Sequence, residues 1–94
     1  MIKSFRHKGL RLFWEYDDKR KLPAGQLNKI MQMLELIDNA QRVPQDFEFF
    51  KSWRVHLLKG ELKDFWSLTV KENWRIVFRF DEGNAFDIDY LDYH

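Results

Sequence analysis

The stretch FWSLTVKENWRIVFRFDEGNAFDIDYLDYH, residues 65–94, decides the fold class of this chain. Large apolar side chains occupy every second position in three successive runs: Trp66, Leu68 and Val70, then Trp74, Ile76, Phe78 and Phe80, then Phe86, Ile88 and Tyr90. A period of two is typical of strands that bury one face. The polar links from Lys71 to Asn73 and from Asp81 to Asn84 suit tight turns. The stretch therefore predicts three consecutive antiparallel strands.

The same alternation divides the residues between the two faces of the predicted sheet. The row from Trp74 to Phe80 carries the large apolar side chains and belongs to the core. Arg75 and Arg79 then point to the opposite face. We regard that second face as the candidate working surface, although arginines on a sheet face commonly do no more than solvate it.

Near the N-terminus the period becomes helical. Leu10, Phe13 and Trp14 have the i, i+3, i+4 spacing of an apolar helix face, and this first helix should end near Tyr16. The short segment from Ile2 to Phe5 can form an edge strand before it. The N-terminal part therefore predicts one short strand and one short helix.

A second helix should start at Pro23, because a proline in the first turn loses no hydrogen bond, and should end at Asp38 and Asn39. Its apolar face consists of Leu27, Ile30, Met31, Leu34 and Ile37. A helical turn around Asp46 to Phe50 and a further strand from Arg54 to Leu58 complete the prediction. The fold class is α+β, with two N-terminal helices packed on one face of an antiparallel β-sheet.

The composition fits a single domain, residues 1–94, because 45% hydrophobic and 17% aromatic residues suffice for a compact core despite 33% charged residues. The absence of cysteine excludes disulfides, thiolate catalysis and cysteine-ligated zinc, and the three histidines show no zinc-motif spacing. The chain contains neither a signal-peptide-like N-terminus nor an apolar run of about 20 residues. We therefore expect a soluble cytoplasmic protein that needs no metal or other cofactor and does not bind membranes.

The charge is small overall but unevenly distributed. The net charge is +1, yet residues 1–30 contain eight Lys and Arg against three Asp and Glu, and residues 51–79 contain seven against three. Residues 81–94 contain five acidic residues and neither Lys nor Arg. Basic segments on a nearly neutral protein permit contacts with phosphate, although simple solvation of the surface explains them equally well.

Several residues in the second half of the chain can support acid–base chemistry. Metal-free cleavage of RNA needs a base for the 2′-hydroxyl, cationic donors for the phosphate and an acid for the departing 5′-oxygen. The sequence offers His56, Lys59, Arg75, Asp92, Tyr93 and His94 for these roles. Gly60 gives the chain freedom to turn after Lys59. Taken singly, His56 is more commonly a surface histidine, and a terminal histidine is commonly frayed.

The order of five segments resembles the HigB-type toxins of the RelE/ParE superfamily along nearly the whole chain. These segments are MIKSFRHKGL (1–10), HLLKG (56–60), FWSLTV (65–70), NWRIVFRF (73–80) and DYLDYH (89–94). The resemblance implies a compact RelE-like fold and a ribosome-dependent endoribonuclease, the toxin of a type II toxin–antitoxin system. Such an enzyme cuts translated mRNA in the decoding site of the 70S ribosome and so inhibits translation and growth.

The resemblance also implies roles for individual residues. The catalytic set is His56, Lys59, Asp92, Tyr93 and His94, and phosphate or RNA is bound by Arg75 and Arg79. His56 and His94 would transfer protons, Lys59 and Arg75 would stabilise charge, and Asp92 would orient a neighbouring side chain. Tyr93 would stack on a base or complete the proton network. The implied partner is a HigA-type helix-turn-helix antitoxin, and operator DNA is reached only through the complex with it.

Two features depart from the family pattern, and two other functions stay open. The segment from Val43 to Trp53 is rich in phenylalanine, which favours core packing and leaves antitoxin contact as an alternative, and Asp64 replaces a common glycine. The main alternative function is ParE-like inhibition of DNA gyrase without nuclease activity, which would not require the acid–base set. A second is an inactive module that binds RNA or the antitoxin.

Overall fold

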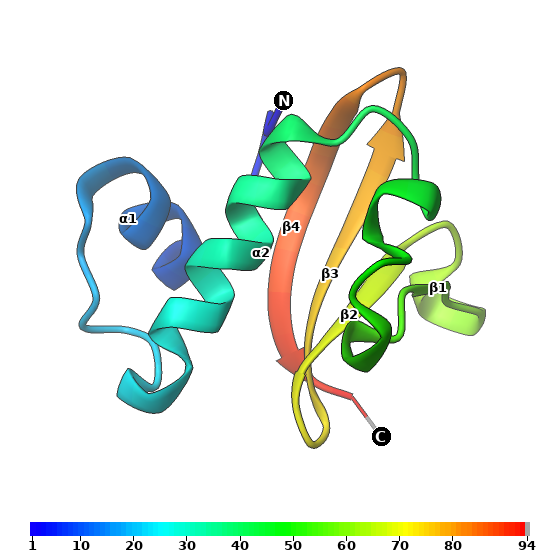
Figure 1. The fold of residues 1–94 in the computed structure, drawn as a ribbon. Coiled ribbons are helices and arrows are strands. Elements are labelled where there is room, and N and C mark those ends of the chain that lie inside the picture. The colour runs from blue at the N-terminus through cyan, green and yellow to red at the C-terminus, as the bar shows by residue number, and fades with distance from the viewer. Residues whose placement is uncertain (94) are drawn as a thin grey trace.

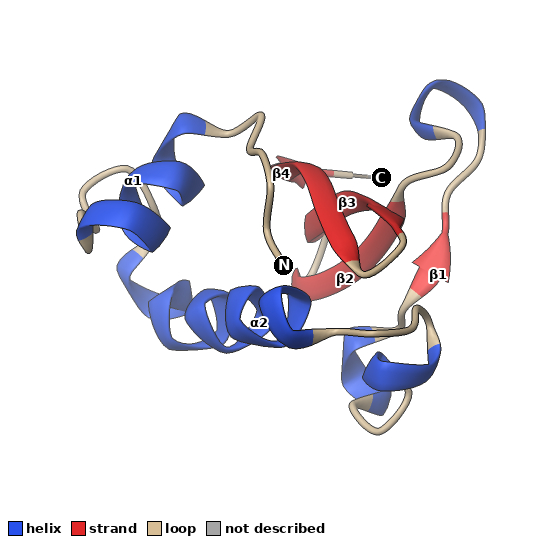
Figure 2. Ribbon diagram, turned by 90° about the horizontal axis from the view of Figure 1, so that it is seen from above, coloured by secondary structure: helices blue, strands red, loops and turns tan. Residues whose placement is uncertain are grey.

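The computed structural model describes residues 1–93. Its regular elements are helices α1 (Lys8–Tyr16) and α2 (Leu27–Asn39), 3-10 turns η1 (Ala24–Gln26), η2 (Gln45–Phe47), η3 (Lys51–Trp53) and η4 (Gly60–Leu62), and strands β1 (His56–Leu57), β2 (Trp66–Lys71), β3 (Trp74–Asp81) and β4 (Asn84–Asp92). The strands form one antiparallel sheet in the order β1-β2-β3-β4. Both helices lie on one side of it (Figures 1 and 2). The predicted α+β architecture is confirmed.

Helix α1 is bounded by local signals at both ends. The Nδ1 atom of His7 accepts a hydrogen bond from the backbone N–H of Leu10 at 3.1 Å, which satisfies one of the unpaired donors of the first turn. At the other end Asp17 adopts a left-handed conformation with φ 56°, and its N–H donates to the carbonyl of Phe13. The predicted end near Tyr16 is confirmed, and His7 is a cap that the apolar spacing could not reveal.

Helix α2 begins slightly later than predicted. Pro23 is extended with ψ 128°, and the 3-10 turn η1 leads from it into the α-helix at Leu27. The buried face consists of Ile30, Met33, Leu34 and Ile37. The prediction that Met31 belongs to the buried face was wrong, because Met31 is only half-buried and Met33 is buried instead. Positions 30, 33, 34 and 37 share one stripe of the helix.

The strands are joined by turns that need unusual backbone angles. In the β3–β4 link, Glu82 and Gly83 have φ values of 46° and 81°, the two consecutive positive angles that a type I′ hairpin requires. Glu72 in the β2–β3 link has φ 53°. A bulge interrupts the β3–β4 pairing between Val77 and Arg79, opposite Asp87, which also has a positive φ.

The main core lies between the helices and one face of the sheet. Its fully buried side chains come from both layers and include Leu10, Ile30, Leu34, Ile76, Phe78 and Ile88. Trp74 stacks on Tyr90 with ring centroids 4.9 Å apart, and the Tyr90 hydroxyl donates a hydrogen bond to Oε1 of Gln26. This contact fastens the end of the sheet to the start of α2.

Two further segments cover the sheet edges. The N-terminal residues run parallel to β4 through isolated bridges at Ile2 and Phe5, so the expected edge strand is present in this reduced form (Figure 2). Between α2 and β1, the phenylalanine-rich segment contributes both buried and exposed side chains: Phe47 is fully buried in the core, whereas Phe49 is 85% exposed.

Among the described residues, no helix is both long and apolar enough to cross a membrane.

Candidate functional site

The face of the sheet turned away from the helices, called here the open face, carries a polar row across β2 and β3. Ser67 pairs with Val77, and Thr69 pairs with Arg75, so these four side chains share one side of the sheet. The apolar row of the same strands, which includes Trp66, faces the helices. The position of Arg75 on the face opposite the core is confirmed.

His56 lies at the edge of this open face. It belongs to β1 and pairs with Ser67, so two strand spacings of about 4.8 Å each separate it from β3. Its Nδ1 atom lies 2.7 Å from the carbonyl oxygen of Arg54. A carbonyl can only accept, so Nδ1 carries a proton, and in the neutral tautomer of this ring Nε2 is the proton acceptor. The His56 side chain is exposed and its acceptor nitrogen points away from the Arg54 bond.

Lys59 follows β1 and is not brought against His56. It is exposed and extended at the start of η4, and within residues 1–93 no hydrogen bond or ion pair joins the two side chains. Gly60 has φ 73°, so the predicted freedom to turn is used here. Asp64 has φ 75°, a left-handed conformation that glycine adopts without strain, so a glycine at this position would suit the backbone.

The C-terminal residues run antiparallel to the start of β3. Leu91 pairs with Arg75, Asp92 pairs with Trp74, and the N–H of Tyr93 donates to the carbonyl of Asn73 at 2.9 Å. Alternation places Leu91 and Tyr93 on the open face and Asp92 in the row that faces the helices. Tyr93 is 37% exposed. The residues that precede His94 therefore lie beside the start of β3 and Arg75, whereas the expectation for His94 lies outside the described residues.

Arg75 is held over the β2–β3 turn. Its Nη1 donates to the carbonyl of Glu72 at 2.7 Å, while its Nε is buried and has no hydrogen-bond partner within the described chain. The same holds for the hydroxyls of Ser67 and Thr69, to which we assigned no role from the sequence. The sequence could have indicated both residues, because Ser67 and Thr69 alternate with Trp66 and Leu68 in FWSLTV and so belong to the row of Arg75.

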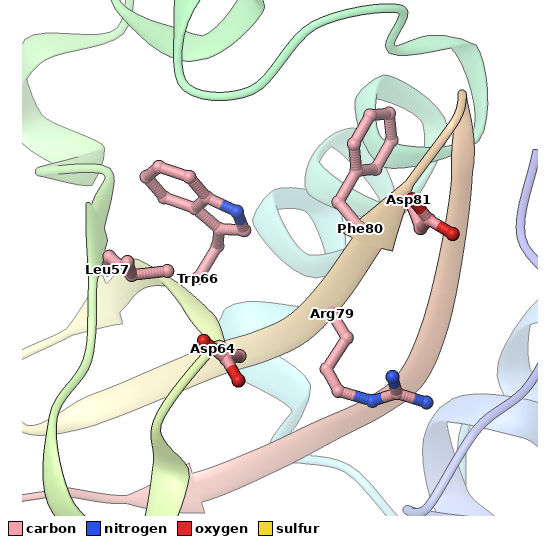
Figure 3. Close-up of a pocket in the computed structure, with 6 residues that line it drawn as sticks. All are labelled: Leu57, Asp64, Trp66, Arg79, Phe80 and Asp81. Carbon is pink, nitrogen blue, oxygen red and sulfur yellow. The ribbon is translucent and has the colours of Figure 1, made fainter.

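Arg79 has a different environment from Arg75. Its guanidinium forms an ion pair with Asp87, with Nη2 2.8 Å from Oδ2, and lies over the Phe86 ring. It lines a pocket of about 450 Å³ together with Leu57, Asp64, Trp66, Phe80 and Asp81. Figure 3 shows Arg79 and Phe80 leaving β3 in opposite directions. None of the other predicted site residues lines this pocket, so it is separate from the row around Arg75.

The structure thus brings together part of the predicted set. His56, Arg75 and Tyr93 share the open face, and Arg79 lies on it further along β3. Lys59 lies in the loop after β1, and Asp92 lies in the row that faces the helices. Leu58, Phe65 and Val77 form a second small core on the same side of the sheet, and the Arg6 guanidinium lies 4.9 Å from the Phe65 ring centroid. Within residues 1–93, no three His, Cys, Asp or Glu side chains are grouped as metal ligands.

Comparison with solved structures defines the class of fold. The chain is similar to YafQ from E. coli, with 15% sequence identity, a TM-score of 0.56, and coverage of 98% of this chain and 91% of that chain. It is also similar to the conserved hypothetical protein HP0894 from Helicobacter pylori, with 17% identity, a TM-score of 0.50, and coverage of 99% and 98%. At these identities the similarity establishes the RelE-like α+β fold alone.

The sequence comparisons are more specific. The model of the HigB-like toxin family, described as the RelE-like toxin of the type II toxin-antitoxin system HigB, matches residues 3–94. Endoribonuclease HigB of Proteus vulgaris is 40% identical over all of both chains, and Toxin HigB-1 of Vibrio cholerae is 33% identical over all of this chain and 98% of that protein. The chain belongs to the HigB-like toxin family. Membership of a type II toxin–antitoxin family implies an antitoxin partner.

Proposed function

We propose that this chain is a type II toxin that cleaves translated mRNA in the decoding site of the ribosome, by metal-independent attack of the 2′-hydroxyl on the neighbouring phosphate. Family membership and the relative named Endoribonuclease HigB support the nuclease class. The observation that carries the proposal is an imidazole with a defined acceptor nitrogen, His56, on the same open face as Arg75. A gyrase inhibitor would need neither.

The bond between His56 and the Arg54 carbonyl supports a role in proton transfer. Because Nδ1 donates to that carbonyl at 2.7 Å, neutral His56 presents Nε2 to receive the proton of a 2′-hydroxyl. The 2′-oxygen then bonds to phosphorus, and the bond from phosphorus to the 5′-oxygen breaks. The leaving 5′-oxygen takes a proton from the second imidazole, His94.

Cationic side chains stabilise the charge that gathers on the phosphate. Arg75 projects from the open face near the β2–β3 turn, and Lys59 lies in the loop after β1. Tyr93, beside the start of β3, stacks on a base or completes the proton network. Asp92 orients a neighbouring histidine or lysine. Arg79 adds a weaker contact with the RNA, because Asp87 already neutralises much of its charge.

The partners follow from the same assignment. A HigA-type helix-turn-helix antitoxin silences the toxin and connects the complex to operator DNA. The exposed Phe49, packed edge-on against Phe50, is a candidate contact with that antitoxin, because a large exposed aromatic side chain contributes more in an interface than on a free surface. Action on translated mRNA places the active protein in the cytoplasm.

Mapping of mRNA ends tests the nuclease directly. The wild type and the His56→Ala/His94→Ala variant are induced separately, and 5′ ends are mapped on translated and untranslated copies of one transcript. We expect translation-dependent cuts from the wild type, and the double variant should lose them, because each proton-transfer group contributes about 10²- to 10⁴-fold in rate.

A third histidine provides the matched control. His7 caps α1 away from the open face, and asparagine preserves the cap, so the His7→Asn variant should keep cutting. Circular dichroism confirms that each variant is folded. Growth arrest with intact messages would reject the proposal and favour inhibition of gyrase, and unchanged cutting by a folded double variant would remove the histidines from the mechanism.

A further inference from the structure

Two buried polar side-chain atoms on neighbouring strands of the open face have no hydrogen-bond partner within the described chain. Thr69 and Arg75 are direct cross-strand partners in β2 and β3, so their side chains lie side by side. The Thr69 hydroxyl oxygen and the Arg75 Nε atom are both buried, and neither has a hydrogen-bond partner among residues 1–93. A buried polar atom left unpaired destabilises the free protein, so this arrangement calls for a functional reason.

The chemistry of the pair selects the kind of ligand. Nε–H of an arginine only donates, and a threonine hydroxyl can donate, so one negatively charged oxygen satisfies both at once. The guanidinium brings its full charge to the same point, since Arg75 forms no ion pair with any residue of the described part of the chain. An anionic oxygen, rather than a neutral group or a cation, is the complement of this arrangement.

We infer that Thr69 and Arg75 together bind one non-bridging oxygen of an RNA phosphate, with the Thr69 hydroxyl as a substrate-binding group that the family resemblance did not indicate. The identity of the ligand rests on the proposed function. Both atoms are covered in the free protein, so the phosphate enters as the guanidinium turns away from the Glu72 carbonyl that now holds it. His56 lies on the same face, one strand away in β1 and two residue pairs along the sheet.

Ser67 differs from Thr69 in a way that makes it the matched control. It lies on the same strand and face, and its hydroxyl is also unpaired, but its side chain is fully buried between His56 and Val77. Thr69 and Arg75 are only half-buried. Once the Arg75 guanidinium turns away, a ligand on the surface therefore reaches Thr69, whereas Ser67 stays covered.

The test is a titration of the folded full-length chain with inorganic phosphate and with a 2′-O-methyl RNA trinucleotide, which binds without being cleaved. Nuclear magnetic resonance follows the Nε–H signal of Arg75 in the wild type and in the Thr69→Val and Ser67→Ala variants. We expect this signal to shift in the wild type and in Ser67→Ala, and affinity for both ligands to fall about tenfold in Thr69→Val, as for loss of one hydrogen bond to a charged group.

The outcomes separate this inference from the proposed function. The inference that Thr69 and Arg75 bind phosphate together would be rejected by either of two results. One is an Arg75 Nε–H signal that does not shift at saturating phosphate, and the other is equal affinity in folded Thr69→Val and wild-type protein. The His7→Asn variant should bind the trinucleotide as the wild type does, because His7 caps α1 and belongs to no part of the proposed site. Failure of the nuclease would appear instead as intact messages in the mapping experiment, whatever the titration shows.

Discussion

His7 and His56 show how the same residue type acquires different tasks from its immediate neighbours. The Nδ1 of His7 accepts an N–H at the start of α1, whereas the Nδ1 of His56 donates to a carbonyl. The ring of His7 also meets the edge of Tyr90, with centroids 5.7 Å apart. One histidine is therefore fixed as a cap in the neutral form, and the other is left with an outward-facing acceptor.

The stability of the protein should fall at mildly acidic pH because of His7. Burial lowers the pKa of its imidazole below the ordinary 6.5, and the nearby Asp89 carboxylate opposes this only in part. Since the folded state binds fewer protons than the unfolded state, this contribution to stability is complete above pH 6.5 and is lost as the pH falls through 6.5 towards the lower pKa of the folded state.

Urea unfolding measured from about pH 7.5 to 5 checks this expectation, because that interval spans the ordinary titration of histidine. The His7→Asn variant retains a capping side chain that does not titrate in this interval, so its unfolding free energy should depend less steeply on pH. Parallel pH profiles for the two proteins would show that His7 does not titrate on unfolding as described.

At the level of the elements, the β3–β4 hairpin depends on its turn. Gly83 has φ 81° and nothing lies within 4 Å of where a β-carbon would stand, so substitution there strains only the backbone. The Gly83→Ala variant should lose about 1–2 kcal/mol of unfolding free energy. Gly25, equally unobstructed but without a left-handed φ, supplies the control, and Gly25→Ala should be neutral or slightly stabilising.

Chemical denaturation of both glycine variants measures the difference. Equal stability of the two would mean that the turn relaxes to another type without cost. The hairpin matters for the site as well as for stability, because β4 carries Leu91 opposite Arg75 and continues to Tyr93. A shift of one residue in the pairing would move Tyr93 to the face of the helices.

On the scale of the whole molecule, helices α1 and α2 both lie on one side of the sheet (Figure 1). We propose that the opposite side binds the RNA. A reaction on that face by the proposed set of side chains has defined products. Attack by the 2′-hydroxyl leaves a 2′,3′-cyclic phosphate on one fragment and a 5′-hydroxyl on the other. We therefore expect the new 5′ ends to accept label only from a polynucleotide kinase and to resist an exonuclease that requires a 5′-phosphate.

The same assay in 1,10-phenanthroline, at a Mg²⁺ concentration that keeps ribosomes assembled, should give an unchanged cleavage rate. The expected charge stabilisers are Arg75 and Lys59 rather than a transition metal. A 5′-phosphate at the cut, or a rate that collapses with the chelator and returns with added zinc, would contradict the proposed chemistry.

The sequence by itself determined the element order, the three long strands and most of the two faces of the sheet. The expected row of Phe86, Ile88 and Tyr90 was wrong at Phe86, because the bulge at Asp87 puts Phe86 on the face of Arg79. Alternation and helical spacing are local, and burial of one face makes them visible in residues such as Trp66, Leu68 and Ile76. Motif order also supplied the family, which the comparisons confirmed. The sequence did not predict the exact start of α2 or the burial of Met33 in place of Met31, because a short 3-10 turn changes the phase of the helix.

The tertiary structure alone decided which of the candidate residues lie together. Cross-strand register put Thr69 against Arg75 and carried Tyr93 to the same face, while Asp92 fell into the opposite row. It also gave Arg79 an acidic partner, Asp87, eight residues away in sequence. Register and hydrogen-bond partners depend on turns, bulges and packing between distant segments, so the periodicity of a single strand cannot contain them.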